Sequence, residues 1–308
     1  RKRRLEDYDW YLFWNVYSIG ATDFWGNFRS KVKNIVRGEH YDNVYKEILE
    51  KKLTDNTVLF LSEPPSVVPR NYNKSLHENF RYIFTWKNSL VDAKKHHKFY
   101  IPVAENFKSI VNVPFSDRKL IADISGNKFS SHERELYTER RNTIKFFEQN
   151  YPYDFDLYGV GWDWSVKRYL WNGVRNGTWE KHRYKTYRGT VRDKLDVLPK
   201  YKFVICYENI LDEDDYVSNR IFDVLRCGCV PIYWGAKNIS DYVDEDAFID
   251  RRDFKSNEAL AEHICSISEK EYEKFLCAGR AYINGEKFKL FLSDNFSDTI
   301  IKVLRLNS

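Results

Sequence analysis

The stretch from Tyr207 to Gly235 constrains the fold most, because it runs from the end of one expected strand through a loop and a helix to a second strand. An apolar run, Phe203–Tyr207, is followed by an acidic loop, a helical pattern over Val217–Arg226 and a second apolar run, Val230–Trp234. A Cys-Gly-Cys turn separates the helix from the second run. Two strands that are joined through a helix lie parallel in one sheet. This unit therefore predicts an α/β protein.

The rest of the chain repeats this alternation of short apolar runs and helical patterns. The expected strands lie within Tyr8–Ser18, Thr57–Ser62, Phe80–Trp86, Leu120–Ile124 and Asp156–Val160. The expected helices are Asp42–Lys52, Glu133–Asn150, Ala259–Ser268, Glu269–Tyr282 and Asp298–Leu306. Strands that alternate with helices predict parallel sheets with helices on their faces. The pattern restarts near Lys119, so we expect two Rossmann-like domains, 1–117 and 118–308.

Composition argues against several classes of protein. A hydrophobic content of 43% is enough for packed cores, yet no apolar run approaches the roughly 18–20 residues that span a bilayer. The net charge of +5 is spread along the chain, which argues against nucleic-acid binding. The basic run Arg1–Arg4 is the exception, and it is either a solvated terminus or a contact with an anionic membrane surface or with nucleic acid.

The cysteines indicate a reducing compartment. Their number, five, is odd and their spacing is not that of a disulfide framework. Cys206 and Cys229 lie in or beside apolar strands, so we expect them to be buried free thiols. We therefore expect a cytoplasmic protein, with a membrane-peripheral position as the alternative.

Polar side chains gather where the acidic loop enters the helix after Tyr207. They are Asn209, Tyr216, Ser218, Asn219 and Arg220. A helix N-terminus offers backbone N–H groups and a partial positive charge, so it suits a phosphate. An arginine adds a cation that can bind two phosphate oxygens at once. The sequence therefore predicts a phosphate site at this helix start.

Four segments form a pattern that is specific when they are taken together: Lys119–Glu148, Asp156–Trp162, Tyr187–Asn209 and Asp215–Ile239, the last containing VPIYWG. This pattern resembles the α-1,3/4-fucosyltransferases of glycosyltransferase family 10. The resemblance implies the GT-B fold, in which two Rossmann-like domains face a cleft. It makes 1–117 the acceptor-binding domain and 118–308 the nucleotide-sugar domain, with a return of the last helix onto the first domain as an alternative.

The resemblance implies donor-binding roles for named residues. Asn127 lies in the loop where the family has an Asn, and Arg140 stands where the family has an Arg that grips the donor diphosphate. Arg141 is the alternative, one residue further along. Glu208 and Asn209 match the Glu-Asn pair at the end of the family's donor strand.

Five further residues match the family's Tyr-Val-Thr-Glu-Lys at the helix start. Tyr216 and Val217 match its first two positions, which lie by the nucleotide sugar. Ser218, Asn219 and Arg220 stand at the Thr, Glu and Lys positions. Arg220 keeps the charge for phosphate, whereas Asn219 lacks a carboxylate expected near the ribose or sugar hydroxyls. A related sugar nucleotide is therefore the alternative to GDP-fucose.

In the first half, Leu59–Ser66 looks like the Glu-x-Pro segment of the family, in which the Glu is the proposed general base. Glu63 occupies that position. An inverting transferase must remove a proton from the acceptor hydroxyl as it attacks the anomeric carbon, and a carboxylate at a strand end suits this role. The alternative is that Glu63 caps the turn of Pro64 and Pro65.

The resemblance implies an inverting transfer of fucose, or a related 6-deoxy sugar, from GDP to a carbohydrate acceptor, with an α-1,3 linkage. The expected partners are the nucleotide-sugar donor and a glycan acceptor, without nucleic acid. We expect no metal and no cofactor, since arginines would neutralise the diphosphate. The acidic run Asp212–Asp215 is accordingly predicted to be a solvated loop rather than a metal site. The alternative function is a non-catalytic module that binds sugar nucleotides or glycans on the same fold.

Overall fold

The computed structural model describes residues 9–16, 44–103, 113–163 and 184–305 of the chain. They fall into two compact units, Arg1–Phe99 and Tyr100–Ser308. This division comes earlier than the predicted boundary at residue 117. The segment that follows Phe99 packs with the second unit, since the N–H of Val103 donates a 2.8 Å hydrogen bond to the carbonyl of Phe291.

The first unit is built on a four-stranded parallel sheet in the order β1-β2-β3-β4. Its strands are β1 (Tyr11–Trp14), β2 (Thr57–Leu61), β3 (Tyr82–Thr85) and β4 (His96–Lys98), and its described α-helices are α2 (Val44–Glu50) and α3 (Lys74–His77). Every residue of β2 and β3 is buried, as is typical of central strands in a parallel sheet. The sequence did not predict β4, because its His-His-Lys carries no apolar pattern.

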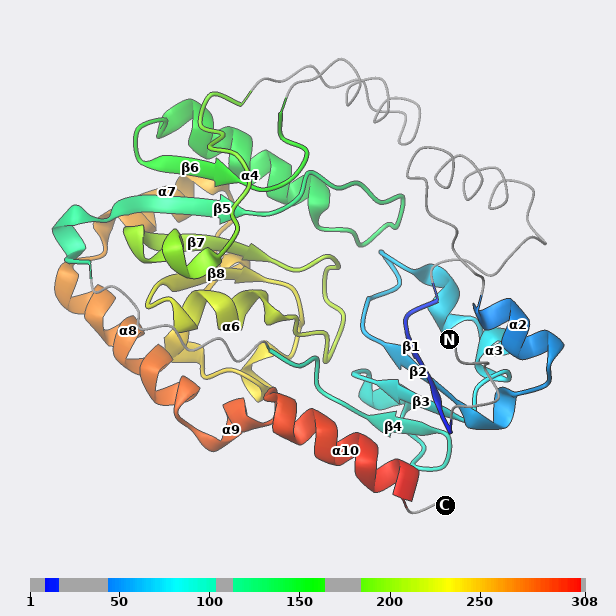
Figure 1. Ribbon diagram of the computed structural model, residues 1–308. Helices are drawn as coiled ribbons and strands as arrows, with labels where there is room; N and C mark the ends of the chain where they lie inside the picture. Colours follow the sequence, from blue (N-terminus) through cyan, green and yellow to red (C-terminus); the bar gives the residue numbers. More distant parts are fainter. Residues whose placement is uncertain (1–8, 17–43, 104–112, 164–183, 306–308) are drawn as a thin grey trace. The chain divides into compact units, whose positions relative to one another are not determined.

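The second unit holds a five-stranded parallel sheet in the order β6-β5-β7-β8-β9 (Figure 1). Its strands are β5 (Lys119–Ile124), β6 (Phe155–Tyr158), β7 (Tyr201–Tyr207), β8 (Val230–Trp234) and β9 (Ile249–Asp250). The chain places β6 on one side of β5 and β7 on the other, so the strand order reverses between β5 and β7. Open α/β sheets bind ligands outside the carboxyl ends of the strands at such a reversal.

Helices cover both faces of this second sheet. The described α-helices of the unit are α4 (Tyr137–Asn150), α6 (Asn219–Arg226), α7 (Asn257–Ser266), α8 (Glu269–Ile283), α9 (Glu286–Lys289) and α10 (Ser293–Arg305). α4 and α7 pack on the face that carries Phe203 and Tyr207. α6 packs on the opposite face, which carries Val204 and Cys206. Two parallel sheets with helices confirm the predicted α/β class.

The ends of the predicted helices shift where a side chain caps the backbone. The helix expected from Val217 begins at Asn219, because the side chain of Ser218 accepts a hydrogen bond from the N–H of Arg220. The helix expected to reach Ser268 ends at Ser266. Ser268 instead caps α8, in a reciprocal pair of hydrogen bonds with Glu271.

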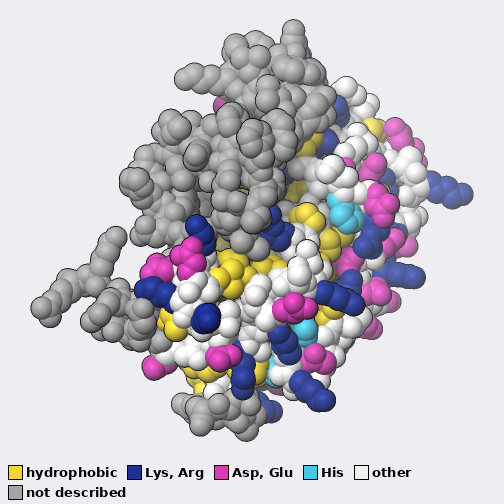
Figure 2. All heavy atoms as spheres, turned by 90° about the vertical axis from the view of Figure 1, so that its right-hand side faces the viewer, with side chains coloured by type: hydrophobic (Ala, Val, Ile, Leu, Met, Phe, Trp, Pro, Cys, Tyr) yellow, Lys and Arg dark blue, Asp and Glu magenta, His cyan; other side chains and the backbone are white. Residues whose placement is uncertain are grey.

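The spread of charge on the described surface and the burial of Cys206 and Cys229 agree with the sequence predictions. On the face that Figure 2 shows, acidic and basic side chains of the described residues are interspersed rather than gathered by sign. Within the described ranges, no helix is long and apolar enough to cross a membrane. Cys206, Cys227 and Cys229 are buried free thiols, as expected for the first and last of them, while Cys265 and Cys277 are exposed.

Candidate functional site

The carboxyl ends of β5 and β7 bring the predicted donor residues together. The loop after β5 contains Asn127, and the loop after β7 runs from Glu208 to the start of α6. α4 inserts Arg140 at the end of β7, where its Nη2 donates hydrogen bonds to the carbonyls of Tyr207 (2.5 Å) and Glu208 (2.8 Å). The candidate site therefore lies at the reversal of strand order, within the second unit.

The loop after β5 is fixed by the turn that follows β6. The backbone N–H of Asn127 donates to the carbonyl of Val160 (2.9 Å), and its side-chain amide donates to the carbonyl of Gly161 (3.1 Å). Gly159 has a φ of +124°, and a Cβ there would clash with the carbonyl of Ser125, so only glycine fits. The side-chain amide of Asn127 thus holds the loop. Its buried Oδ1 has no hydrogen-bond partner among the described residues, so this oxygen could accept a hydrogen bond from a ligand.

Arg140 is only 2% exposed. Burial and the nearby charge of Arg220 lower the pKa of Arg140 to about 10, against the opposing effect of Asp123, so it stays charged at neutral pH. Its Nε and Nη1 find no acceptor within the described residues. The alternative, Arg141, instead donates to the carbonyl of Lys128 (2.7 Å) in the loop after β5. The structure therefore brings Arg140 to the end of β7 and leaves Arg141 beside that loop.

Glu208 joins the end of β7 to the start of α6. It is fully buried, and its Oε1 accepts a 2.8 Å hydrogen bond from the backbone N–H of Ser218. A Cβ at Gly235 would clash with the side chain of Glu208, so the glycine of the Tyr-Trp-Gly motif makes room for this carboxyl group. Asn209, the next residue, is also buried.

Arg220 stands in the first turn of α6. Its backbone N–H donates a 3.4 Å hydrogen bond to Oγ of the capping residue Ser218. Its guanidinium donates a long hydrogen bond of 3.5 Å to Oδ1 of Asn209. Such a weak contact can be exchanged for a phosphate oxygen at little cost, so Arg220 suits an anionic ligand.

The other predicted residues of this segment differ in exposure. Tyr216 and Val217 are 2% exposed, and the side chain of Val217 packs in the hydrophobic core on the α6 face. Asn219 is exposed, and its amide donates a 3.5 Å hydrogen bond to Asp223 of its own helix. Asn219 therefore lies at the helix start, as predicted, with its side chain in solvent.

Two buried carboxyl groups share the site with the two arginines. Glu208 is one, and the other is Asp123 on β5, which accepts a hydrogen bond from the hydroxyl of Ser125. Burial raises the pKa of both carboxyl groups, while the charges of Arg140 and Arg220 act to lower it. The sequence did not point to Asp123, because it lies within the apolar run of a strand and gains meaning only from the strand order.

The acidic run after β7 is only half solvated, so the predicted solvated loop is wrong for two of its four residues. Glu213 is 3% exposed and pairs with Arg134, and Asp215 is 8% exposed and accepts a 2.6 Å hydrogen bond from the hydroxyl of Tyr242. Asp212 and Asp214 are exposed. In the described part of the chain, no group of three His, Cys, Asp or Glu could hold a metal ion.

Glu63 follows the carboxyl end of β2 in the first unit. Asn15, at the end of the neighbouring β1, holds this turn: its Oδ1 accepts hydrogen bonds from the backbone N–H groups of Ser62 (3.1 Å) and Glu63 (3.2 Å). Asn15 has a φ of +60°, which asparagine tolerates better than most residues. The hydroxyl of Tyr72 donates to the carbonyl of Glu63 (2.8 Å). The turn is thus fixed at its backbone, and the role of Glu63 as base stays a prediction.

Comparisons with known proteins show which proteins this chain is similar to. Residues 170–289, which include the β7–α6 region, match a family model described as "Glycosyltransferase family 10 (fucosyltransferase) C-term". This part of the chain therefore resembles the C-terminal part of glycosyltransferase family 10. An alpha-(1,4)-fucosyltransferase of Arabidopsis thaliana is 42% identical over 64 residues, which are 21% of this chain and 16% of that relative. The alpha-(1,3)-fucosyltransferase FucT of Helicobacter pylori is 31% identical over 74 residues, 24% of this chain and 15% of that relative.

A solved structure shares the fold of this chain. The crystal structure of an alpha1,3-fucosyltransferase with GDP-fucose has a TM-score of 0.52 at 15% sequence identity, and the match covers 82% of this chain and 75% of that one. The likeness confirms the predicted GT-B fold class. The curated relatives, by contrast, are matched over less than a fifth of their own length.

Proposed function

We propose that this chain transfers fucose, or a related 6-deoxy sugar, from a GDP-sugar to a carbohydrate acceptor. The observation that carries the proposal is the placement of Arg220 and Arg140 at the reversal of strand order, beside the start of α6. A diphosphate is the anion that fits two guanidinium groups and a helix N-terminus. The fold relative solved with GDP-fucose supports this choice of donor.

The proposed reaction is a single displacement with inversion. The acceptor hydroxyl oxygen bonds to the anomeric carbon as the bond from that carbon to the diphosphate breaks, and Glu63 takes the hydroxyl proton. Arg220 and Arg140 stabilise the charge that develops on the departing GDP, which is an electrostatic role that requires no metal. An α-1,3 linkage is the expected product.

The test is to mix the protein with GDP-fucose and a panel of oligosaccharides and to follow GDP release over hours. Release that depends on an acceptor supports the proposal. EDTA should leave the rate unchanged, because arginines supply the charge that neutralises the diphosphate. A complete loss of turnover in EDTA that manganese or magnesium restores would overturn the metal-independent mechanism.

A second candidate is a non-catalytic module that binds a sugar nucleotide. The observation that favours it is Asn219, which stands at the helix start where the family has Glu. A ligand that binds only the folded state raises the melting temperature. A rise with GDP-fucose and no GDP release with any acceptor would support this candidate over the transferase.

A further inference from the structure

The β7–α6 loop, residues Asn209–Val217, adopts a backbone that the chain does not favour by itself. Asp212 has a φ of +48° and Asp215 a φ of +70°, although neither is glycine. Residues in this region persist only where the surrounding structure fixes them. The loop leads directly into Ser218 and Arg220, so whatever fixes it also places the proposed donor groups.

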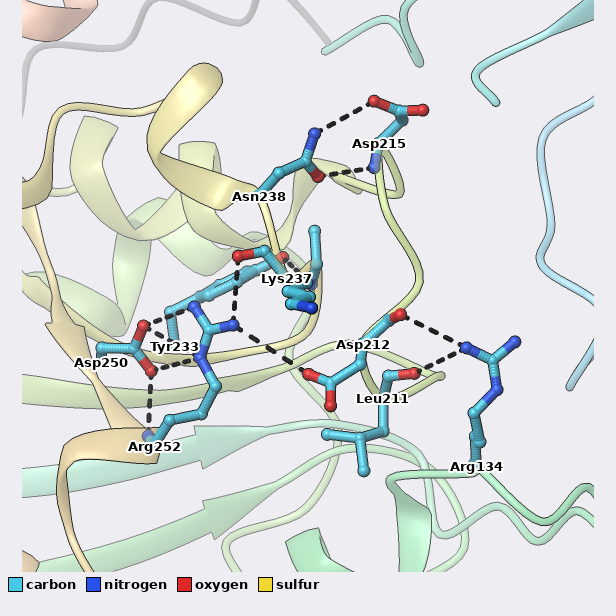
Figure 3. A network of polar contacts seen from close by, with 10 residues as sticks. Arg134, Leu211, Asp212, Asp215, Tyr233, Lys237, Asn238, Asp250 and Arg252 are labelled. Carbon is cyan, nitrogen blue, oxygen red and sulfur yellow. Dashed lines mark hydrogen bonds and ion pairs between the residues drawn. The ribbon is translucent and has the colours of Figure 1, made fainter. Parts of the chain in front are cut away.

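Arg134 holds the first half of this loop. Its Nη1 donates to the carbonyls of Leu211 (3.4 Å) and Asp212 (3.3 Å), and its Nη2 pairs with the carboxylate of Glu213 at 2.5 Å. Its own carbonyl accepts a 2.7 Å hydrogen bond from the N–H of Leu211. Figure 3 shows the guanidinium of Arg134 reaching the carbonyls of Leu211 and Asp212. One side chain thus binds three consecutive residues of the loop.

Other segments of the second unit hold the same loop from the far side (Figure 3). The N–H of Asp215 donates to Oδ1 of Asn238 (2.8 Å), and Arg252 lies 4.0 Å from the carboxylate of Asp212. Arg252 is itself paired with Asp250 at the end of β9. Asn238 thus fixes the second half of the loop, while Arg134 and Arg252 hold the first.

The two side chains of the Arg134–Glu213 ion pair differ in their exposure to solvent. The side chain of Glu213 is 3% exposed, whereas that of Arg134 is 40% exposed. A carboxylate in that position depends on its partner, since a buried charge without one is unfavourable. Arg134 therefore supports both the backbone at Asp212 and the buried carboxylate of Glu213.

We infer that Arg134 is a positioning residue of the donor site, which holds the β7–α6 loop in the arrangement that binds the nucleotide. This inference rests on the proposed function and names a residue that acts through the loop. The apparent Kd of a ligand rises in inverse proportion to the fraction of time that its site is correctly arranged. Loss of Arg134 therefore weakens donor affinity, while saturating donor restores the arranged loop and the turnover rate.

The test compares GDP binding by titration calorimetry in the wild type and in the double variant Arg134→Gln/Glu213→Gln, which removes both charges of the ion pair together. We expect the Kd for GDP to rise about tenfold or more in the double variant. Arg280→Gln is the matched control, because it removes another guanidinium paired with a glutamate, Glu273, on the exposed face of α8. Its Kd should equal that of the wild type.

A second measurement tests the loop without relying on GDP. Hydrogen exchange of the ligand-free protein should show faster exchange for the amides of residues 210–217 in the double variant, with the exchange of β5 and β8 unchanged. Arg134→Lys keeps the charge but has one amine nitrogen in place of the two guanidinium nitrogens that contact the loop. Its loop amides should exchange at a rate between those of the wild type and the double variant. Unchanged exchange in the loop, or an unchanged Kd for GDP, would overturn the inference. A wild type that binds no GDP would instead contradict the proposed function and leave the exchange result to decide the role of Arg134.

Discussion

Arg140 serves the site from inside the protein. Its guanidinium supports the carbonyls at the end of β7 and faces the charges of Asp123, Glu208 and Arg220. Two of its N–H donors find no acceptor within the described residues, so the same side chain can support the strand and bind a ligand oxygen. A residue with both tasks should affect folding as well as binding.

Arg140→Met is predicted to destabilise the folded protein by about 3–5 kcal/mol, because it takes a donor from the buried carbonyls of Tyr207 and Glu208 and one of the nearby cations from the buried carboxyl groups. Urea unfolding of the wild type and the variant measures this difference. Arg141→Met is the matched control, since Arg141 lies one residue further along α4 and is less buried. Equal losses of stability in the two variants would contradict the structural role of Arg140.

Glu63→Gln is predicted to lower the transfer rate by about 10²–10⁴, which is typical for loss of a general base. The Kd for GDP should not change, because the proposed donor residues all belong to the second unit. Glu50→Gln, on the exposed end of α2, is the control. Wild-type turnover in Glu63→Gln would place the base elsewhere, and a weakened Kd for GDP would make Glu63 a structural residue.

Among the elements, the connection from β3 to β4 is organised by one carboxylate. Oδ1 of Asp92 accepts hydrogen bonds from the backbone N–H groups of Lys94 (2.9 Å), Lys95 (2.8 Å) and His96 (2.8 Å). Its Oδ2 lies 3.0 Å from Nδ1 of His96. Partial burial acts to raise the pKa of Asp92, but the hydrogen bonds, those from His96 first, lower it well below its usual range.

A lowered folded-state pKa means that the unfolded chain binds the proton more readily. The stabilisation from Asp92 is therefore complete above its unfolded pKa of about 3.9 and is lost as the pH falls below it. Asp92→Asn should lower the melting temperature at pH 7, and the difference from the wild type should shrink toward about pH 3. A difference that stays constant between these pH values would contradict the charged hydrogen bonds described here.

Elements were predictable where their own residues carry the pattern. β2, β7 and β8 are apolar runs and were found, whereas β4 and the two-residue β9 were not, because they are defined by pairing with a neighbour. α4 was expected from Glu133 but begins at Tyr137, since Glu135 instead bridges to Ile210 of the β7–α6 loop. That contact joins residues far apart in the sequence, so no local pattern could indicate it.

Residues of the candidate site were likewise predictable only where a local sequence pattern indicates them. Glu208, Asn209, Ser218 and Arg220 were predictable because they lie in one continuous strand–loop–helix unit. The residues that the sequence did not indicate are those whose partners come from another strand or loop: Asn15, Asp123 and Arg134. Strand order and long-range pairing give these three their roles.

At the scale of the whole molecule, the residues of the proposed donor site all belong to the second unit. Asn127, Arg140, Glu208 and Arg220 all lie within Tyr100–Ser308, and the contacts described among them form within that unit. The central claim is that this unit binds a nucleoside diphosphate at the reversal of its strand order. The roles of 1–117 in acceptor binding and of the last helix stay predictions.

The most direct test of this claim is the Kd for GDP of the full chain with and without Arg220. A charged hydrogen bond contributes roughly 1.5–3 kcal/mol, so Arg220→Ala should weaken binding by about tenfold to a hundredfold. Arg226→Ala, in the last turn of the same helix, is the control and should keep the wild-type Kd. If the wild type binds GDP and Arg220→Ala binds it equally well, the diphosphate does not lie at the start of α6, and the account is contradicted.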